Sequence, residues 1–214
     1  MKYKLVIFDW QGTLTDVIGQ FVKQFFDSAK LIGLPDVDES KLRSLMHLDI
    51  CYLIQTLYPE SVYSSKRSAM FNYFIDYRMH HGHDVCVFPG AKQLIMRLIE
   101  NNVFIGIATA ASLITLKEEV AYAGLTELID ACKTPDHTLG KPAPDMLNEL
   151  MAEFDCEPKE TVMIGDSRCD FEAAQHAKVD FIGLHIRSDA LTRDVLNHQS
   201  CVACDVSALL PLLN

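Results

Sequence analysis

The sequence predicts an α/β protein: a doubly wound core around a parallel β-sheet, with a small all-helical segment inserted near its start. Two observations lead to this class. Short apolar runs alternate with helical patterns along most of the chain, which is typical of a parallel sheet covered by helices on both faces. Between residues 16 and 83, by contrast, apolar residues recur only at helical spacing. We therefore expect a core of residues 1–14 and 85–214 and a helical insert of residues 15–84.

The elements follow from the apolar pattern in order. The first strand is expected at residues 4–9, where an apolar run ends in a polar turn broken by Gly12. Three helical stretches follow in the insert, over residues 17–29, 42–57 and 70–79. The rest is expected to form helix 91–101, strand 103–109, helices 113–123 and 145–154, strand 161–165, helix 171–177 and strand 181–186.

Composition and charge exclude several classes of protein. The chain has 214 residues, of which 49% are hydrophobic, so it can bury a sizeable core. It carries 29 acidic and 19 basic side chains, and this net charge of −10 argues against broad binding to nucleic acid or anionic membranes. The apolar run at residues 103–116 is too short to span a bilayer, and residues 1–9 lack a secretory pattern. We expect a cytoplasmic protein, a monomer by default with a dimer as the alternative.

The cysteines and one histidine cluster have simple interpretations. Seven scattered cysteines in a long chain favour reduced thiols over a disulfide framework. Cys201 and Cys204 have the spacing of a redox or half-zinc pair, but no second pair completes such a site. Three histidines around Gly82 could bind a transition metal, although polar linker residues are expected there: His80, His81 and His83.

Polar side chains follow the ends of three expected strands. Asp9 ends the first strand, Thr109 the second and Asp166 the third, with Asp170 one helical turn later; Lys141 lies in a loop between the last two strands. Since ligands bind at the carboxyl ends of parallel strands, we expect these side chains to meet. Carboxylates suit Mg²⁺, an ammonium and a hydroxyl suit a phosphoryl group, and aspartate can be a covalent nucleophile. Each residue alone has an ordinary explanation, such as a helix cap or a solvated charge; the ordered set is more specific.

These segments resemble the four motifs of the haloacid dehalogenase superfamily, over nearly the whole chain. Within it, the sequence is most similar to the phosphoglycolate phosphatase and β-phosphoglucomutase group. The resemblance implies a Rossmann-type core and a small helical cap inserted after the first motif. The segments that carry it are Phe8-Asp9-Trp10-Gln11-Gly12-Thr13-Leu14, Thr109, Lys141-Pro142-Ala143-Pro144-Asp145, and Ile164-Gly165-Asp166-Ser167 with Asp170.

The resemblance also implies an activity: a Mg²⁺-dependent phosphohydrolase that acts on a small phosphorylated metabolite through an aspartyl-phosphate. Asp9 would attack phosphorus. The metal ligands would be Asp9, the backbone carbonyl of Gln11 and Asp166, with Asp170 close by or acting through water.

The remaining implied roles concern the substrate. Thr109 and the Ala110 amide would hold the phosphoryl oxygens, and Lys141 would neutralise charge on the nucleophile and the transferring group. The cap would supply specificity. Two cap residues are candidates for substrate contacts: Arg43 for an anionic tail, and His47 for proton transfer near neutral pH.

Position 11 departs from the family pattern. Phosphatases of this family carry a second Asp there, which protonates the leaving oxygen and later activates water, whereas this chain has Gln11. An amide cannot exchange protons at neutral pH, and general acid–base catalysis contributes about 10²–10⁴-fold. The resemblance therefore implies impaired turnover of ordinary alkyl phosphates.

Four interpretations of Gln11 remain open. The protein could hydrolyse substrates with good leaving groups, bind a phosphorylated ligand or partner without hydrolysis, or perform other chemistry; Gln11 could also be an engineered change. Phosphonatases share the Asp-Trp-x-Gly-Thr motif but use a cap lysine that forms an imine. In this chain His47 falls at the position of that lysine. Dehalogenases need no magnesium, so the pair Asp166 and Asp170 argues against that chemistry.

Overall fold

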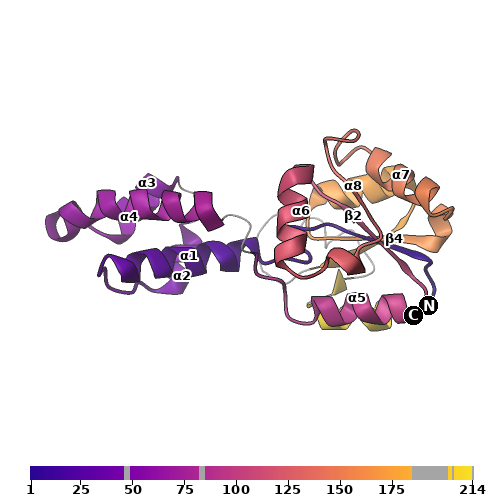
Figure 1. Cartoon of the computed structure of the whole chain (residues 1–214), viewed down its shortest axis with the longest axis horizontal. Helices are drawn as coiled ribbons and strands as arrows, with labels where there is room; N and C mark the ends of the chain where they lie inside the picture. The colour runs from indigo at the N-terminus through magenta and orange to yellow at the C-terminus, as the bar shows by residue number, and fades with distance from the viewer. Residues whose placement is uncertain (46–48, 82–84, 185–201, 204, 214) are drawn as a thin grey trace. The chain divides into compact units, whose positions relative to one another are not determined.

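The computed structural model describes residues 1–45, 49–81, 85–184, 202–203 and 205–213. The chain divides into two compact units: unit 1 comprises Met1–Asp16 and Val85–Asn214, and unit 2 comprises Val17–Asp84 (Figure 1). Thr15 and Asp16, expected in the insert, belong to unit 1. The reason is local pairing, because the Asp16 amide donates a hydrogen bond to the Cys86 carbonyl at 2.6 Å.

Unit 1 is built on a six-stranded sheet in the order β3-β2-β1-β4-β5-β6, and every described pairing is parallel. The doubly wound α/β prediction is confirmed. Two short strands that the sequence pattern did not predict, β3 and β6, add to the four that it did. The strands are β1 (Leu5–Phe8), β2 (Phe104–Ala108), β3 (Ala131–Lys133), β4 (Thr161–Gly165), β5 (Asp180–Leu184) and β6 (Val202–Ala203).

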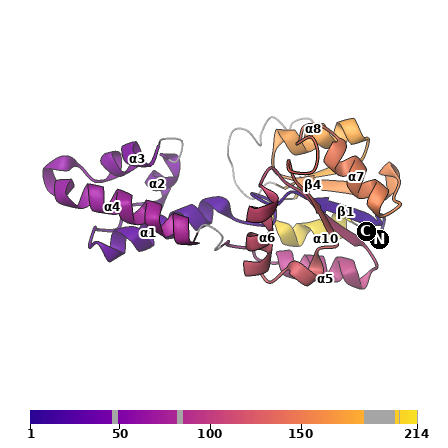
Figure 2. The same ribbon diagram turned by 45° about the horizontal axis from the view of Figure 1, so that its top comes forward.

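Helices cover both faces of this sheet. In Figure 2, α7 and α8 lie on one side of the strands, and α5 and α10 lie on the other. Alternate residues of β1 point to opposite faces of the sheet. Leu5 and Ile7 pack with α7 and α8, whereas Val6 and Phe8 pack with α5 and α10. The helices of unit 1 are α5 (Ala91–Glu100), α6 (Leu113–Tyr122), α7 (Asp145–Glu153), α8 (Arg168–Ala177) and α10 (Leu209–Leu212), with 3₁₀ turns η1 (Thr126–Leu128), η2 (Pro158–Glu160) and η3 (Val206–Ala208).

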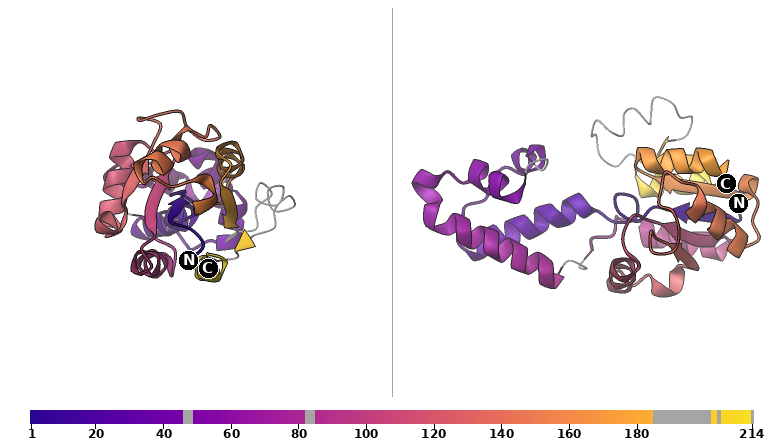
Figure 3. Two further views of the ribbon diagram at one scale, coloured as in Figure 1. Left: turned by 90° about the vertical axis from the view of Figure 1, so that its right-hand side faces the viewer. Right: turned by 90° about the horizontal axis from the view of Figure 1, so that it is seen from above.

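The described residues of unit 2 form helices joined by loops, with no strand among them, and they have their own hydrophobic core. Its two long helices, α1 and α4, pack side by side (Figure 3). At the centre, the ring of Phe25 contacts those of Tyr58 and Phe74 at centroid distances of 6.3 and 6.2 Å. The helices are α1 (Val17–Leu31), α2 (Glu39–Ser44), α3 (Ile50–Leu57) and α4 (Glu60–His81).

The helical stretch expected over residues 42–57 forms two helices instead of one. Asp38 caps α2 by accepting a hydrogen bond from the Ser40 amide, and Asp49 caps α3 in the same way from the Tyr52 amide. The interruption has a physical signal in the sequence, because aspartate at a helix N-cap favours a new start. None of the helices in the described part of the chain is long and apolar enough to cross a membrane.

Candidate active site

Three carboxylates meet at the carboxyl ends of β1 and β4. Asp9 follows β1, Asp166 follows β4, and Asp170 lies in the first turn of α8. One oxygen of each carboxylate lies within 4.8 Å of the other two. β1 and β4 are paired with Phe8 opposite Ile164, so the residues after them emerge side by side. The fold thus brings together the three carboxylates that the strand order predicts at this edge of the sheet.

Lys141 joins this cluster from the loop after β3. Its ammonium donates hydrogen bonds to Asp9 at 2.7 Å, to Asp170 at 2.6 Å and to the carbonyl of Ala108 at 2.7 Å. Only 6% of its side chain is exposed. Lys141 is therefore a buried ion-pair partner of two carboxylates and not a solvated loop charge.

Two glycines allow the close approach of the carboxylates. Gly12 has φ of +90°, and a Cβ there would collide with the carboxylate of Asp166. A Cβ on Gly165 would likewise meet the side chain of Asp170. Thr13 adds a further tie, since its hydroxyl donates a hydrogen bond to Asp166 at 3.2 Å. The turn after Asp9 thus fits directly against the end of β4.

Asp170 is the most enclosed of the carboxylates, with no exposed surface. Besides Lys141, it accepts hydrogen bonds from the amide of Ser167 at 3.0 Å and from its hydroxyl at 2.6 Å. Ser167 is also the N-cap of α8. Ser167 is named from the sequence only as part of the segment around Asp166, with no role, although Ser167 and Asp170 have the Ser-x-x-acid spacing of a capping box.

Burial and mutual repulsion change the protonation of the cluster. Burial raises the pKa of Asp9 to about 7, against the opposing charge of Lys141 and with the help of Asp170. Burial and the charge of Asp170 raise the pKa of Asp166 to about 6. For Lys141, burial acts to lower the pKa, but Asp9 and Asp170 outweigh it and the pKa is raised. Within the described residues, the ammonium of Lys141 is the cation paired with this group of three carboxylates.

The excess of negative charge at the three carboxylates indicates whether a divalent cation fits the site. Three carboxylates with clustered oxygens are the donor type that Mg²⁺ prefers, and a cation would stabilise the charged forms of Asp9 and Asp166, whose pKa values burial and mutual repulsion raise. The residues present therefore fit a hard divalent metal ion.

Thr109 directly follows β2, at the edge of the sheet where this cluster lies, and is buried. Its amide donates a hydrogen bond to the carbonyl of Lys133, and its hydroxyl accepts one from the Ala111 amide at 3.2 Å. Ala110 follows as an exposed residue. The N-cap of α6 is Ser112, so the helix-cap explanation of Thr109 does not apply.

The other expected site residues fall in different surroundings. Gln11 is exposed in the turn after Asp9. Arg43 lies on α2, where its guanidinium pairs with Glu39 at 2.6 Å. His80 is exposed and contacts the Asp76 carbonyl. The described part of the structure does not include His47, His83, Cys201 or Cys204, nor the side chain of His81.

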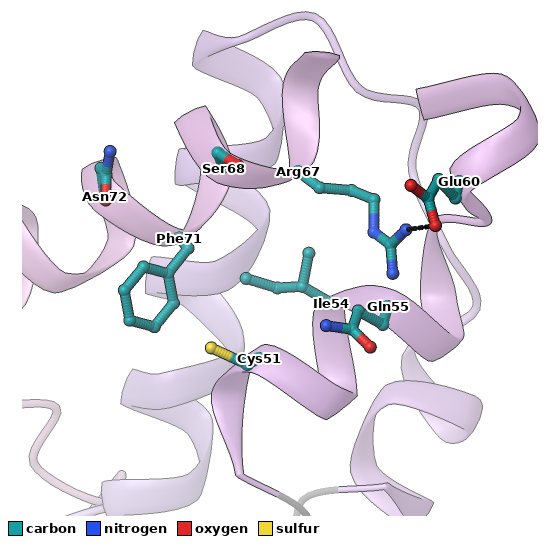
Figure 4. A pocket seen from close by; sticks show the side chains of 8 residues that line it. All are labelled: Cys51, Ile54, Gln55, Glu60, Arg67, Ser68, Phe71 and Asn72. Carbon is teal, nitrogen blue, oxygen red and sulfur yellow. Dashed lines mark ion pairs between the residues drawn. The ribbon is translucent and has the colours of Figure 1, made fainter. Parts of the chain in front are cut away.

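A pocket of about 420 Å³ opens in unit 2, and its lining residues lie between positions 51 and 72 of the chain. Figure 4 shows the Arg67 side chain extending toward Glu60, with which it forms an ion pair at 3.5 Å. None of its lining residues belongs to the carboxylate cluster. They are Cys51, Ile54, Gln55, Glu60, Arg67, Ser68, Phe71 and Asn72.

Comparison with known families assigns the chain. A model described as haloacid dehalogenase-like hydrolase matches residues 6–184. The chain belongs to this family. The match covers the whole carboxylate cluster and Lys141, so the family assignment rests on the segments that build the site.

Relatives of this haloacid dehalogenase-like hydrolase have low sequence identity to it but align with most of its length. A phosphoglycolate phosphatase of Vibrio vulnificus is 25% identical over 192 residues, covering 86% of this chain and 84% of the relative. A phosphonoacetaldehyde hydrolase of Latilactobacillus sakei is 26% identical over 205 residues, covering 87% and 76%. An N-acetylmuramic acid 6-phosphate phosphatase of Pseudomonas aeruginosa is 25% identical, covering 83% and 79%.

Solved structures show the same fold. A HAD-superfamily hydrolase from Geobacter sulfurreducens superposes with a TM-score of 0.68 at 19% identity, covering 100% of this chain and 97% of that one. A hydrolase from Streptococcus pneumoniae gives 0.69 at 19% identity, covering 92% and 100%.

Proposed function

We propose that the protein is a Mg²⁺-dependent phosphohydrolase that acts on a small phosphorylated metabolite through a phosphoryl-aspartate at Asp9. The observation that carries the proposal is the buried cluster of Asp9, Asp166, Asp170 and Lys141 at the carboxyl ends of the strands. Family membership and the phosphatases among its relatives support the reaction class.

The metal would be held by Asp9, Asp166 and the backbone carbonyl of Gln11, with Asp170 beside it. Bound Mg²⁺ would supply positive charge that lets an anionic phosphoryl group approach an anionic nucleophile. The protein groups leave a need for this added positive charge, because Lys141 alone does not balance three carboxylates.

The covalent step belongs to Asp9. A carboxylate oxygen of Asp9 attacks phosphorus, the bond from phosphorus to the leaving oxygen breaks, and a phosphoryl-aspartate remains. The Thr109 hydroxyl and the Ala110 amide would hold the phosphoryl oxygens, and the Lys141 ammonium would offset their charge. Water then attacks phosphorus, which releases phosphate and restores the carboxylate.

Gln11 limits this cycle at its two proton transfers. The amide cannot give a proton to the leaving oxygen or take one from the attacking water. Substrates whose leaving group departs as a weak base, such as acyl and aryl phosphates, need no such donor. The water step is the same for every substrate and stays slow. We therefore expect acetyl phosphate to phosphorylate Asp9 faster than simple alkyl phosphates do, with the water step limiting its turnover.

Unit 2 would serve as the cap that selects the substrate. Its helical insertion directly after Asp16 supports this role. Arg43 and His47 would contribute contacts to the substrate from α2 and the segment after it. The three relatives compared above are named for activities on small molecules that carry phosphorus, which supports a substrate of that class.

The decisive experiment compares the protein with its Gln11→Asp variant. Mg²⁺-dependent hydrolysis of acetyl phosphate and of an aryl phosphate is measured, together with the intact mass of the protein. We expect a gain of about 10²-fold or more in the variant. An inert variant with no phosphoryl group on Asp9 would contradict the proposal and favour a silent phosphate-binding scaffold.

The second candidate is a phosphonatase. It is favoured by the relative that hydrolyses phosphonoacetaldehyde and by the shared sequence motif from Asp9 to Thr13. Its imine chemistry requires a lysine where we align His47. Borohydride trapping with phosphonoacetaldehyde separates the two: a reduced adduct on the protein would support the phosphonatase, and its absence the phosphatase.

A further inference from the structure

Trp10, the residue after the nucleophile, is anchored from a distant part of the chain. Its indole N–H donates a hydrogen bond of 2.6 Å to the carboxyl oxygen Oε2 of Glu119 on α6. Trp10 is completely buried and Glu119 is only 4% exposed. Burying a carboxyl group is costly unless it is hydrogen-bonded, and a buried indole N–H also requires an acceptor. The hydrogen bond therefore gives the buried indole N–H its acceptor and the buried carboxyl group a donor.

Trp10 also closes the turn that carries the site. Its carbonyl accepts hydrogen bonds from the amides of Leu14 and Thr15, each at 3.0 Å, and from the Thr15 hydroxyl at 3.1 Å. Gln11, Gly12 and Thr13 lie inside this turn, and Thr13 reaches Asp166. A displacement of Trp10 would therefore shift the turn that follows Asp9 relative to Asp166.

Helix α6 is a firm support for Glu119. Its first turn is capped by Ser112, and the Leu113 amide donates a hydrogen bond to Asp136 at 2.6 Å in the loop after β3. Its buried side includes Leu116 and Val120 in the core of unit 1. The helix begins directly after the Thr109 loop, so the bond from Glu119 to Trp10 connects the phosphate-binding side of the site to the nucleophile side.

We propose that Glu119 is a positioning residue: through the Trp10 indole it holds the turn of Asp9 and Gln11 in the geometry that phosphoryl transfer requires. The catalytic part of this inference rests on the proposed function; the structural part does not. Misplacement of a reacting group by about 1 Å can cost about 10²-fold in rate. The bond therefore acts on the rate of the chemical step more than on substrate binding.

Three variants test the role. Glu119→Leu removes the acceptor, and Glu119→Gln keeps one. Glu118→Leu changes the exposed neighbour on the same helix and is the matched control. At temperatures where every variant is folded, we expect Glu119→Leu to lower kcat for acetyl phosphate by about 10-fold or more with little change in KM. Glu119→Gln and Glu118→Leu should stay close to the parent protein.

A second measurement needs no turnover. Trp10 is the single tryptophan of the chain, so its fluorescence reports only on this turn. Quenching by acrylamide should be weak in the parent protein and in Glu119→Gln, and stronger in Glu119→Leu. If the parent protein shows no hydrolysis, the proposed function fails, and the quenching result alone decides whether Glu119 holds the turn.

Several outcomes would overturn the proposal. One is parental kcat and quenching in folded Glu119→Leu; another is stronger quenching with parental kcat, which would make the bond purely structural. A rise in KM alone, or a loss in Glu119→Gln as large as in Glu119→Leu, would also refute it. Where Glu119→Leu does not fold, Trp10→Phe removes the N–H and keeps a smaller aromatic side chain, and parental kcat in that variant would count against the proposal.

Discussion

Asp9 and Asp166 show how one crowded carboxylate cluster ties metal binding to pH. Their pKa values, about 7 and about 6, lie above the ordinary value of 3.8 because burial and neighbouring carboxylates disfavour the charged forms. The folded protein without metal therefore binds more protons than the unfolded chain in this range. Its stability should fall as pH rises toward neutrality.

Mg²⁺ should reverse that trend, because it binds the deprotonated carboxylates. We expect the thermal stabilisation by Mg²⁺ to be larger at about pH 8 than at about pH 5.5, since protons compete for Asp9 and Asp166 at the lower pH. Thermal unfolding with and without Mg²⁺ at the two pH values measures this. Asp155→Asn, which changes an exposed carboxylate outside the cluster, should retain the effect. Equal stabilisation at the two pH values would contradict the assignment of these ligands.

At the scale of elements, helix α8 links fold stability to the site. Its N-cap Ser167 satisfies the start of the helix and also donates a hydrogen bond to Asp170 at 2.6 Å. Helix α6 has the same kind of cap in Ser112, whose side chain contacts its own helix start and no carboxylate of the cluster. The two serines therefore form a matched pair for separating capping from site geometry.

Ser167→Ala and Ser112→Ala should each cost about 1 kcal/mol of stability through loss of a helix cap. Ser167→Ala should in addition weaken Mg²⁺ binding, because Asp170 loses a donor that fixes its orientation. Denaturant unfolding measures the first effect and calorimetric Mg²⁺ titration the second. If the two variants bind Mg²⁺ equally well, Ser167 has no role beyond capping.

For the whole molecule, the two units have separate hydrophobic cores. The core of unit 2 contains Phe25 and residues of all four of its helices, while the two sides of the sheet form the cores of unit 1. Regions with separate cores can open independently. We therefore expect the units to differ in their response to a core substitution.

Phe25→Ala should destabilise unit 2 by about 3–5 kcal/mol, since it removes a fully buried ring and leaves a cavity. Hydrogen exchange followed by mass spectrometry should show lost protection in α1 and α4 and unchanged protection in β1 and β4. Leu150→Ala, in a core of unit 1, should give the reverse pattern. Loss of protection throughout the chain in either variant would show that the units unfold together.

The apolar pattern of the sequence was enough to predict the α/β class, four of the six strands and the positions of Asp9, Thr109, Asp166 and Asp170 at element ends. These features are local: a buried strand needs a continuous apolar run, and the chemistry sits where each run stops. The short strand β3 was missed because its three residues are only partly buried and show no such run. The break between α2 and α3 was missed because apolar spacing continues across it.

The partners of individual atoms in distant residues were decided by tertiary structure. Strand order and the family resemblance already predicted that Lys141 meets the carboxylates, but only the fold shows its ammonium bonded to Asp9, 132 residues away, and to Asp170. The same holds for the bond from Trp10 to Glu119, which spans 109 residues. Local propensity carries no information about such pairs, because they form only when β-strands align and helices pack over them. The sequence determined which groups are available for chemistry; the packing of the sheet determined which of them meet.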